Sequence, residues 1–315
     1  VETKDFSLNA TFNIGHNKNK IDKLASGEKE WILTSAWRND VVNSDDYRAY
    51  VGGTSGLIYG YVNDGFYTVA DFESFDSKSR TWKLKEGVVD SSPLSDTPRP
   101  GNAKFKKLTP VDPNSTNPYQ LTEADRTVIG NTTPKFSGGF GLNATYKGFD
   151  MSMFFNFMYD FDVLNANKIM LTTWADNKEN NFLMDIASDK RWRNFDDMGN
   201  EIRYSPEVLA EFNKNATMWN PTSIGRPICM SYAVEDGSFL RLNSATLGYT
   251  LPSVWTKKVG LSKVRFYVSG NNLFTLTGYS GYDPEVNIAT GLTPNIDYNR
   301  YPRSRTYTFG AQLTF

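Results

Sequence analysis

The sequence is poor in the residues from which catalytic and metal sites are usually built. Of its 315 residues, one is cysteine and one is histidine. The lone Cys229 excludes a disulfide within the chain, and a catalytic triad or multi-histidine metal site would depend on His16 alone. Asp283 and Glu285 could serve glycoside hydrolysis as a carboxylate pair, but the intervening Pro284 favours a structured turn. We therefore predict that the chain is not an enzyme.

Long apolar runs and an excess of one charge are also missing. No stretch approaches the roughly 18 consecutive apolar residues of a membrane-spanning helix, and mean hydropathy is −0.49. The net charge of −1 provides no field that would attract nucleic acid. These absences exclude a helical membrane protein and disfavour a nucleic-acid-binding one. They do not exclude a membrane barrel, because its strands are apolar only at every second position.

Aromatic residues are abundant, at 14% of the chain, and many recur at alternate positions. Apolar and small or polar residues alternate from Thr306 to Phe315, which is typical of a strand with one apolar face. The same period of two occurs in five further segments: 6–14, 136–146, 149–161, 239–251 and 263–268. Within the segment 239–251 the alternation changes phase near residues 243–244, where a β-bulge would absorb the shift.

The connections between these segments are of two kinds. Residues 147–148 and 252–262 form short connections. Three others are long: 17–133, 165–237 and 276–303. Short turns at one end and long loops at the other are typical of outer-membrane barrels, whose long loops are extracellular. We therefore predict an all-β fold, part of an antiparallel transmembrane β-barrel, with about six strands in residues 1–315, too few to close a barrel alone.

Several motifs resemble those of SusC/RagA-type TonB-dependent transporters. Residues 236–252, with the sequence DGSFLRLNSATLGYTLP, carry the most specific similarity. The resemblance is collinear over the whole chain. Further similar motifs are found at 124–131, 134–136, 164–169, 268–274, 279–287 and 301–310.

The resemblance implies a barrel of about 22 strands in the bacterial outer membrane, filled by a plug and covered by a SusD-like surface lipoprotein. Residues 1–315 would form its C-terminal segment, and the plug and the first strands would lie outside them. The implied function is TonB-driven import of a large nutrient, either glycan or peptide. Two alternatives stay open: a passive porin or adhesin barrel, and a soluble carbohydrate-binding β-domain, whose strands also alternate.

The end of the chain resembles the signal by which barrel-assembly machinery recognises outer-membrane proteins. Thr308, Gly310, Leu313 and Phe315 match its polar, glycine, apolar and terminal aromatic positions. An edge strand with a free end can be paired by strand addition before a barrel closes. We predict that these four residues are an assembly signal.

One loop partly matches a calcium-binding pattern. Asp112, Asn114 and Glu123 fall at positions 1, 3 and 12 of an EF-type loop, where oxygen ligands are needed. Asn117 replaces the required glycine and Pro118 interrupts the run. A solvated loop is therefore the favoured interpretation, and calcium is the one cofactor that the sequence suggests.

Aromatic residues of the long loops are candidates for contact with the substrate or the lid, because rigid flat side chains stack on sugars and anchor protein partners. The candidates are Trp174, Trp192, Trp219 and Tyr282. The competing interpretation is a hydrophobic core within the loops, since loops of this length need apolar packing of their own.

Overall fold

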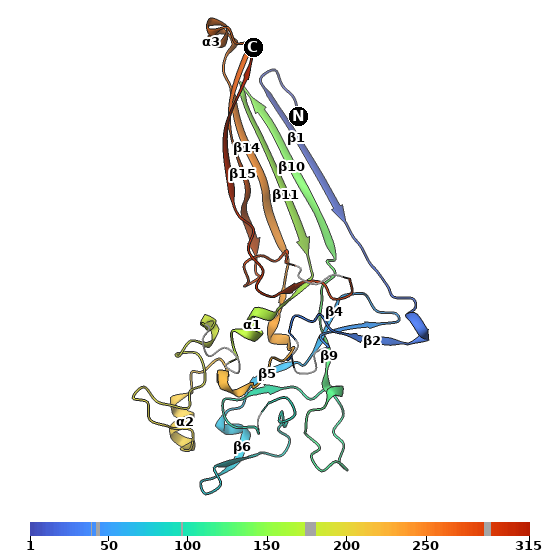
Figure 1. Ribbon diagram of the computed structural model, residues 1–315, viewed down its shortest axis with the longest axis vertical. Helices are drawn as coiled ribbons and strands as arrows, with labels where there is room; N and C mark the ends of the chain where they lie inside the picture. Colours follow the sequence, from blue (N-terminus) through green and yellow to red (C-terminus); the bar gives the residue numbers. More distant parts are fainter. Residues whose placement is uncertain (39, 42–44, 96, 174–180, 287–290) are drawn as a thin grey trace.

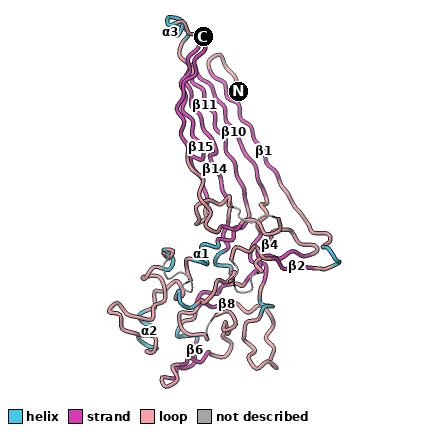
Figure 2. The backbone as a smooth tube through the Cα atoms, viewed as in Figure 1, coloured by secondary structure: helices cyan, strands magenta, loops and turns pink. Residues whose placement is uncertain are grey.

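The structure, a computed structural model, describes residues 1–38, 40–41, 45–95, 97–173, 181–286 and 291–315. A tall antiparallel sheet stands on a body formed by the long connections, here called the loop body (Figures 1 and 2). The sheet has six strands, hydrogen-bonded in the order β1 (Phe6–Gly15), β10 (Phe136–Tyr146), β11 (Phe149–Tyr159), β14 (Phe239–Thr250), β15 (Lys263–Thr277) and β17 (Thr306–Thr314).

The six alternating segments of the sequence are these six strands, so their prediction is confirmed. The bulge near residues 243–244 is confirmed as well. The register of β14 shifts between Leu242 and Ser244 in its pairing with β15, and opposite Phe154 and Phe155 in its pairing with β11. One extra residue in β14 thus returns the apolar side chains on both sides of the bulge to the same face.

The pairing register gives the two faces of the sheet opposite chemistry, because directly paired residues lie on the same face. One row across all six strands is apolar: Leu8, Ala144, Met151, Leu247, Val268 and Phe309. The adjacent row is polar throughout: Asn9, Asn143, Ser152, Thr246, Ser269 and Thr308. The alternation in the sequence therefore becomes one apolar and one polar face.

Phe161 is an exception: the alternation over residues 149–161 predicts it on the apolar face with the other odd-numbered residues, and that prediction is wrong. Strand β11 ends at Tyr159, and Asp160 adopts a φ of +60°. This turn directs Phe161 into the interior, where it is 4% exposed and packs in a cluster with Phe239 and Tyr279. A residue in the left-handed region ends the strand, so the period of two no longer applies beyond it.

The short connections lie at the end of the sheet farthest from the loop body (Figure 1). Lys147 and Gly148 join the paired residues Tyr146 and Phe149, with φ values of +45° and +91°. Two consecutive positive φ values are typical of a two-residue hairpin turn. The other connection forms α3 (Ser253–Thr256) and the 3₁₀ turn η7 (Lys257–Val259).

The loop body contains strands that the alternation of the sequence does not reveal. A four-stranded sheet has the order β2 (Glu30–Leu33), β3 (Tyr47–Tyr50), β4 (Leu57–Gly60) and β9 (Thr127–Asn131). Two-stranded sheets pair β5 (Asn63–Phe66) with β8 (Ala103–Phe105), and β6 (Phe72–Asp76) with β7 (Thr81–Leu84). A three-stranded sheet has the order β13 (Val234–Asp236), β12 (Asp162–Asn165) and β16 (Ile296–Asp297).

Helices in the loop body are short. The α-helices are α1 (Ala166–Met170) and α2 (Pro206–Phe212). The 3₁₀ turns are η1 (Ala25–Gly27), η2 (Val69–Asp71), η3 (Glu123–Asp125), η4 (Met184–Ile186), η5 (Pro221–Ser223) and η6 (Ser231–Ala233). Across the described residues, every helix is too short or too polar to span a bilayer.

The hydrophobic cores lie mainly in the loop body, and the tall sheet contributes to one of them at its lower end, through Phe239 of β14. Tyr61, Phe105 and Trp219 belong to the cluster of one core, and all three are nearly inaccessible. On the apolar face of the sheet, by contrast, Phe12 is 67% and Phe309 is 80% exposed. Soluble proteins rarely expose a contiguous apolar surface that crosses six strands, so the face favours an apolar environment.

The sheet is open. Among the described residues, β1 and β17 each pair with a single strand of the sheet. This agrees with the prediction that six strands do not close a barrel by themselves.

Gly248 of β14 lies beneath an ion pair that crosses the polar face. Arg265 of β15 donates from Nε to Oδ1 of Asp150 in β11 over 2.8 Å. A Cβ atom on Gly248 would stand 2.6 Å from each of these two atoms. Glycine therefore leaves the space through which the two side chains meet.

Replacing Gly248 with valine should separate Asp150 from Arg265 and lower the stability of the intact protein by about 1–3 kcal/mol, the usual range for overpacking. Denaturant unfolding in detergent measures this. Gly15→Val is the matched control, because Gly15 lies on the polar face of β1 and a Cβ atom there would meet nothing closer than 3.7 Å. Equal losses in the two variants would contradict the explanation.

Candidate functional site

The aromatic candidates from the sequence have different environments. Trp192 and Trp219 are 2% and 1% exposed and pack in cores of the loop body, as the competing interpretation expects. Tyr282 is 84% exposed. Trp174 lies outside the described residues. Of the described candidates, Tyr282 thus presents the accessible ring.

Tyr282 lines a pocket where the loop body meets the sheet, here called the mouth site. Its walls come from β12, from α1, which lies directly below the sheet in Figure 1, and from the loop that ends in β16. The pocket has a volume of about 360 Å³. The lining residues are Asn165, Asn167, Lys168, Leu171, Leu183, Ser280, Gly281, Tyr282, Asp297, Asn299 and Arg300.

Asp297 is fixed in the wall of the mouth site by neighbours distant in sequence. The parallel pairing of β12 with β16 sets Asn165 opposite Asp297. The Tyr279 hydroxyl donates to Asp297 Oδ2 over 2.7 Å, and Asn167 Nδ2 donates to Oδ1 over 3.1 Å. Burial raises the pKa of Asp297, while the hydrogen bonds from Tyr279 and Asn167 act in the opposite direction.

Glu235 organises the other side of the mouth site. Its Oε1 accepts from Asn165 Nδ2 over 2.9 Å and from Ser280 Oγ over 2.8 Å. Lys168 Nζ lies 3.6 Å from the same oxygen and 4.3 Å from the centroid of the Tyr232 ring. Amide, hydroxyl and charged groups thus line an open pocket beside an exposed tyrosine. Such a lining suits a ligand rich in hydroxyl or amide groups.

A buried charge cluster holds the loop between β15 and β17 onto the sheet. Arg241 of β14 is 2% exposed, and its terminal nitrogen donates to Asp283 Oδ1 over 2.6 Å. The same nitrogen lies 3.4 Å from Glu285 Oε2. Arg303 reaches both carboxylates from outside, at 3.6 Å and 3.2 Å. The carboxylate pair noted in the sequence is therefore engaged by two arginines, which favours a structural role over hydrolysis.

Removing Arg241 should loosen this loop strongly. Arg241→Met leaves the two carboxylates without their buried partner, and breaking a buried ion pair costs about 3–5 kcal/mol. Hydrogen exchange of residues 278–286 in the intact protein should accelerate accordingly. Arg303→Met is the control, because Arg303 is 46% exposed and exposed pairs contribute about 1 kcal/mol or less. Similar exchange in the two variants would refute the role assigned to Arg241.

The calcium candidates lie apart from the mouth site's lining. Asp112 Oδ1 accepts from the backbone N–H of Asn114 over 2.9 Å, and Glu123 opens η3. Within the described part of the chain, no three His, Cys, Asp or Glu side chains group as a metal site. The buried carboxylate of this region is Asp125. Burial by itself would raise the pKa of Asp125. The hydrogen bonds that its carboxylate accepts from Thr109 and from backbone N–H groups outweigh this effect and lower the pKa.

The four residues of the predicted assembly signal lie on or just beyond edge strand β17. A Cβ atom at Gly310 would collide with the ring of Tyr267, which covers it from β15. Leu313 is half exposed and Phe315 is 90% exposed. Packing against the Tyr267 ring therefore explains the glycine at position 310, whether or not it belongs to an assembly signal.

The geometry has counterparts in known proteins. TonB-dependent receptor P3 of Formosa agariphila is 32% identical over 321 residues, and SusC of Bacteroides thetaiotaomicron is 25% identical over 321 residues. The "closed-closed" structure of the RagAB peptide importer matches the whole chain with a TM-score of 0.65 at 22% identity. Over its whole length the chain is thus homologous to TonB-dependent receptors, SusC among them, and it has the fold of the RagAB importer.

The chain spans only about a quarter of the length of these relatives. All of it is covered in each comparison, but it covers 27% of receptor P3, 25% of SusC and 28% of the matched RagAB chain. No family model matches the sequence. The resemblance that the sequence motifs carry is confirmed, and so is the antiparallel all-β fold of barrel transporters.

Proposed function

We propose that this receptor chain forms part of the wall and of the extracellular mouth of an outer-membrane importer of large nutrients. The observation that carries the proposal is the six-stranded sheet, with one continuous apolar face and one polar face. An unpaired strand edge in hydrocarbon leaves backbone groups unsatisfied, at several kcal/mol each. The outer edges of β1 and β17 would accordingly pair with other strands of the same receptor.

Transport would involve the partners of the family. We propose that a plug and TonB supply the energy, that a SusD-like surface lipoprotein covers the mouth, and that barrel-assembly machinery inserts the receptor. The similarity to SusC and to the RagAB peptide importer supports this assembly. A passive porin or adhesin is disfavoured because the relatives are TonB-dependent receptors. A soluble carbohydrate-binding domain is disfavoured by the exposed apolar face.

The mouth site would contact the nutrient, whether glycan or peptide, since its donors and acceptors suit both. Deleting the gene, or tonB, should abolish uptake of the nutrient at limiting concentration. Tyr282→Ala should reduce that uptake about five-fold or more, the effect of losing a contact worth about 1 kcal/mol or more. Tyr301→Ala is the control, because Tyr301 is 87% exposed and does not line the pocket. Uptake that survives tonB deletion would instead indicate a porin.

The assembly signal has a separate test. Phe315→Ser should lower the outer-membrane level of the receptor several-fold while the inserted protein keeps its thermal stability. The reason is that strand addition to the assembly machinery uses the free end of β17. Quantitative blotting of membrane fractions measures the level. Phe309→Ser makes the same chemical change on the same strand, outside the signal, and should leave more receptor in the membrane. Unchanged abundance of the Phe315 variant would rule out the signal.

A further inference from the structure

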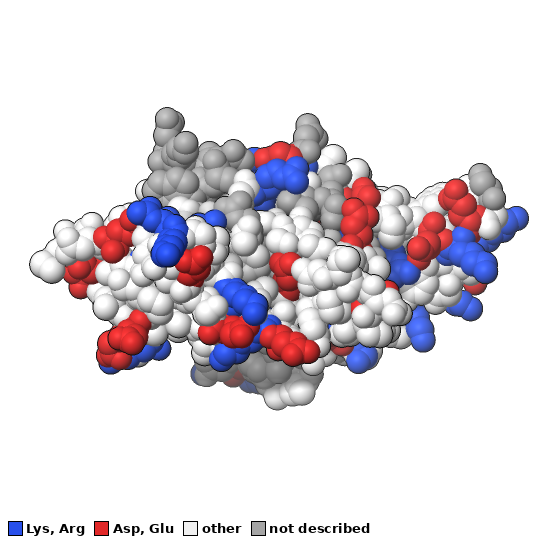
Figure 3. Space-filling model, turned by 90° about the horizontal axis from the view of Figure 1, so that it is seen from below, with Lys and Arg blue, Asp and Glu red and all other residues white. Residues whose placement is uncertain are grey.

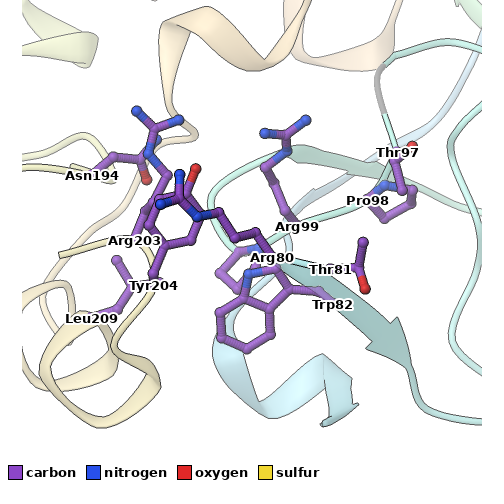
Figure 4. Close-up of a pocket in the computed structure, with 11 residues that line it drawn as sticks. Arg80, Thr81, Trp82, Thr97, Pro98, Arg99, Asn194, Arg203, Tyr204 and Leu209 are labelled. Atoms are coloured by element: carbon purple, nitrogen blue, oxygen red, sulfur yellow. The ribbon is translucent and has the colours of Figure 1, made fainter. Parts of the chain in front are cut away.

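A second pocket, here called the arginine pocket, lies at the end of the loop body farthest from the sheet. It has a volume of about 200 Å³. Its walls come from the β6–β7 hairpin, from residues 97–100 and from the segment that leads into α2 (Figure 4). The lining residues are Arg80, Thr81, Trp82, Thr97, Pro98, Arg99, Pro100, Asn194, Arg203, Tyr204 and Leu209.

Two guanidinium groups of the arginine pocket are held against one aromatic ring. The guanidinium carbons of Arg80 and Arg203 lie 4.7 Å and 5.4 Å from the centroid of the Tyr204 ring. Phe75 stacks on Tyr204 at 6.1 Å and thereby fixes the ring. Arg99 lines the pocket from a third segment (Figure 4). Cation–π contacts orient arginines without neutralising them, so the Tyr204 ring holds Arg80 and Arg203 in place while both stay charged.

Among the described lining residues of this pocket and the one beside it, arginines outnumber acidic residues, of which Asp196 is one. Arg203 pairs with Glu201, but Arg80 has no ion pair with any described residue. An adjoining pocket shares Asn194 and Arg203 with the first and adds Arg191 and Arg193. Arg193 pairs with Asp197 at 2.8 Å.

Arg191 adds to this surplus of positive charge. Its guanidinium donates to the backbone carbonyl of Ile186 over 3.2 Å, and no described carboxylate pairs with it. Burial, and then the charge of Arg193, lower the pKa of Arg191. Over the rest of this end of the molecule, basic and acidic side chains are interspersed (Figure 3). The surplus is therefore local to the two pockets, and no extended field surrounds it.

We propose that the arginine pocket binds the carboxylate or sulfate group of an acidic glycan. The guanidinium group of an arginine can donate two parallel hydrogen bonds to two oxygens of a planar carboxylate or of a tetrahedral sulfate. The hydroxyl and amide groups of Thr81, Thr97 and Asn194 suit the hydroxyls of a sugar, and the indole of Trp82 suits its apolar ring face. The proposal rests on the nutrient-import function and specifies its substrate class. The pocket would then receive the nutrient before the mouth site does.

The test measures binding to the intact detergent-purified receptor by calorimetry. The probes are an oligomer of uronic acids, a sulfated oligosaccharide, a neutral oligosaccharide of equal length and an acidic peptide. Arg80→Gln should weaken binding of the charged oligosaccharides about ten-fold or more, as expected for a lost hydrogen bond to a charged group. Added salt should weaken the wild-type complex as well, because both partners are exposed to solvent. Arg80→Lys should recover only part of the affinity, because lysine lacks the fork.

Arg226→Gln is the matched control, since Arg226 is exposed and lines neither pocket. It should bind like the wild type. The proposal is overturned if the wild type does not bind the charged oligosaccharides. It is also overturned if the Arg80→Gln variant binds them as tightly as the wild type does. Arg80-dependent binding of the acidic peptide alone shows that the glycan class is wrong. TonB-dependent uptake is measured separately. If uptake persists while charged oligosaccharides fail to bind, the import function stands and only this inference falls.

Discussion

Every strand of the tall sheet must keep one apolar face while its backbone groups are paired with its neighbours. The period of two in the sequence satisfies the first demand, and an antiparallel register satisfies the second. The apolar face and the backbone pairing cannot both be kept where the alternation of the sequence changes phase, in β14. The bulge between Leu242 and Ser244 resolves that conflict by leaving one residue out of the pairing. Without it, the half of the strand beyond the bulge would turn its leucines towards the polar face.

The polar face depends on the same register. Asp150 and Arg265 meet over Gly248 because the strands that carry them lie on either side of β14. The ring of Tyr267 covers Gly310 in the same way. Glycines on the polar face thus leave room for long side chains from the neighbouring strands. A one-residue slip would separate these partners and would also reverse the faces.

The loop body follows a different principle. Its strands are short, its helices have few turns, and its stability comes from hydrophobic clusters that join segments distant in the chain. Buried polar networks then fix the exposed loops in position. The cluster of Arg241, Asp283 and Glu285 is one, and the contacts of Asp297 are another. Such networks contribute less to stability than to a single defined geometry, which a binding surface needs.

The sequence alone was sufficient for the six long strands, their apolar sides, the bulge, the short turns and the family. These features repeat locally, so neighbouring residues carry the signal. The sequence was insufficient for the direction of Phe161, for the burial of Trp192 and Trp219, and for the partners of Arg241. These features depend on contacts between segments far apart in the chain, which leave no periodic trace in the sequence. The arginine pocket belongs to the second group, since only the tertiary structure brings its three wall segments together.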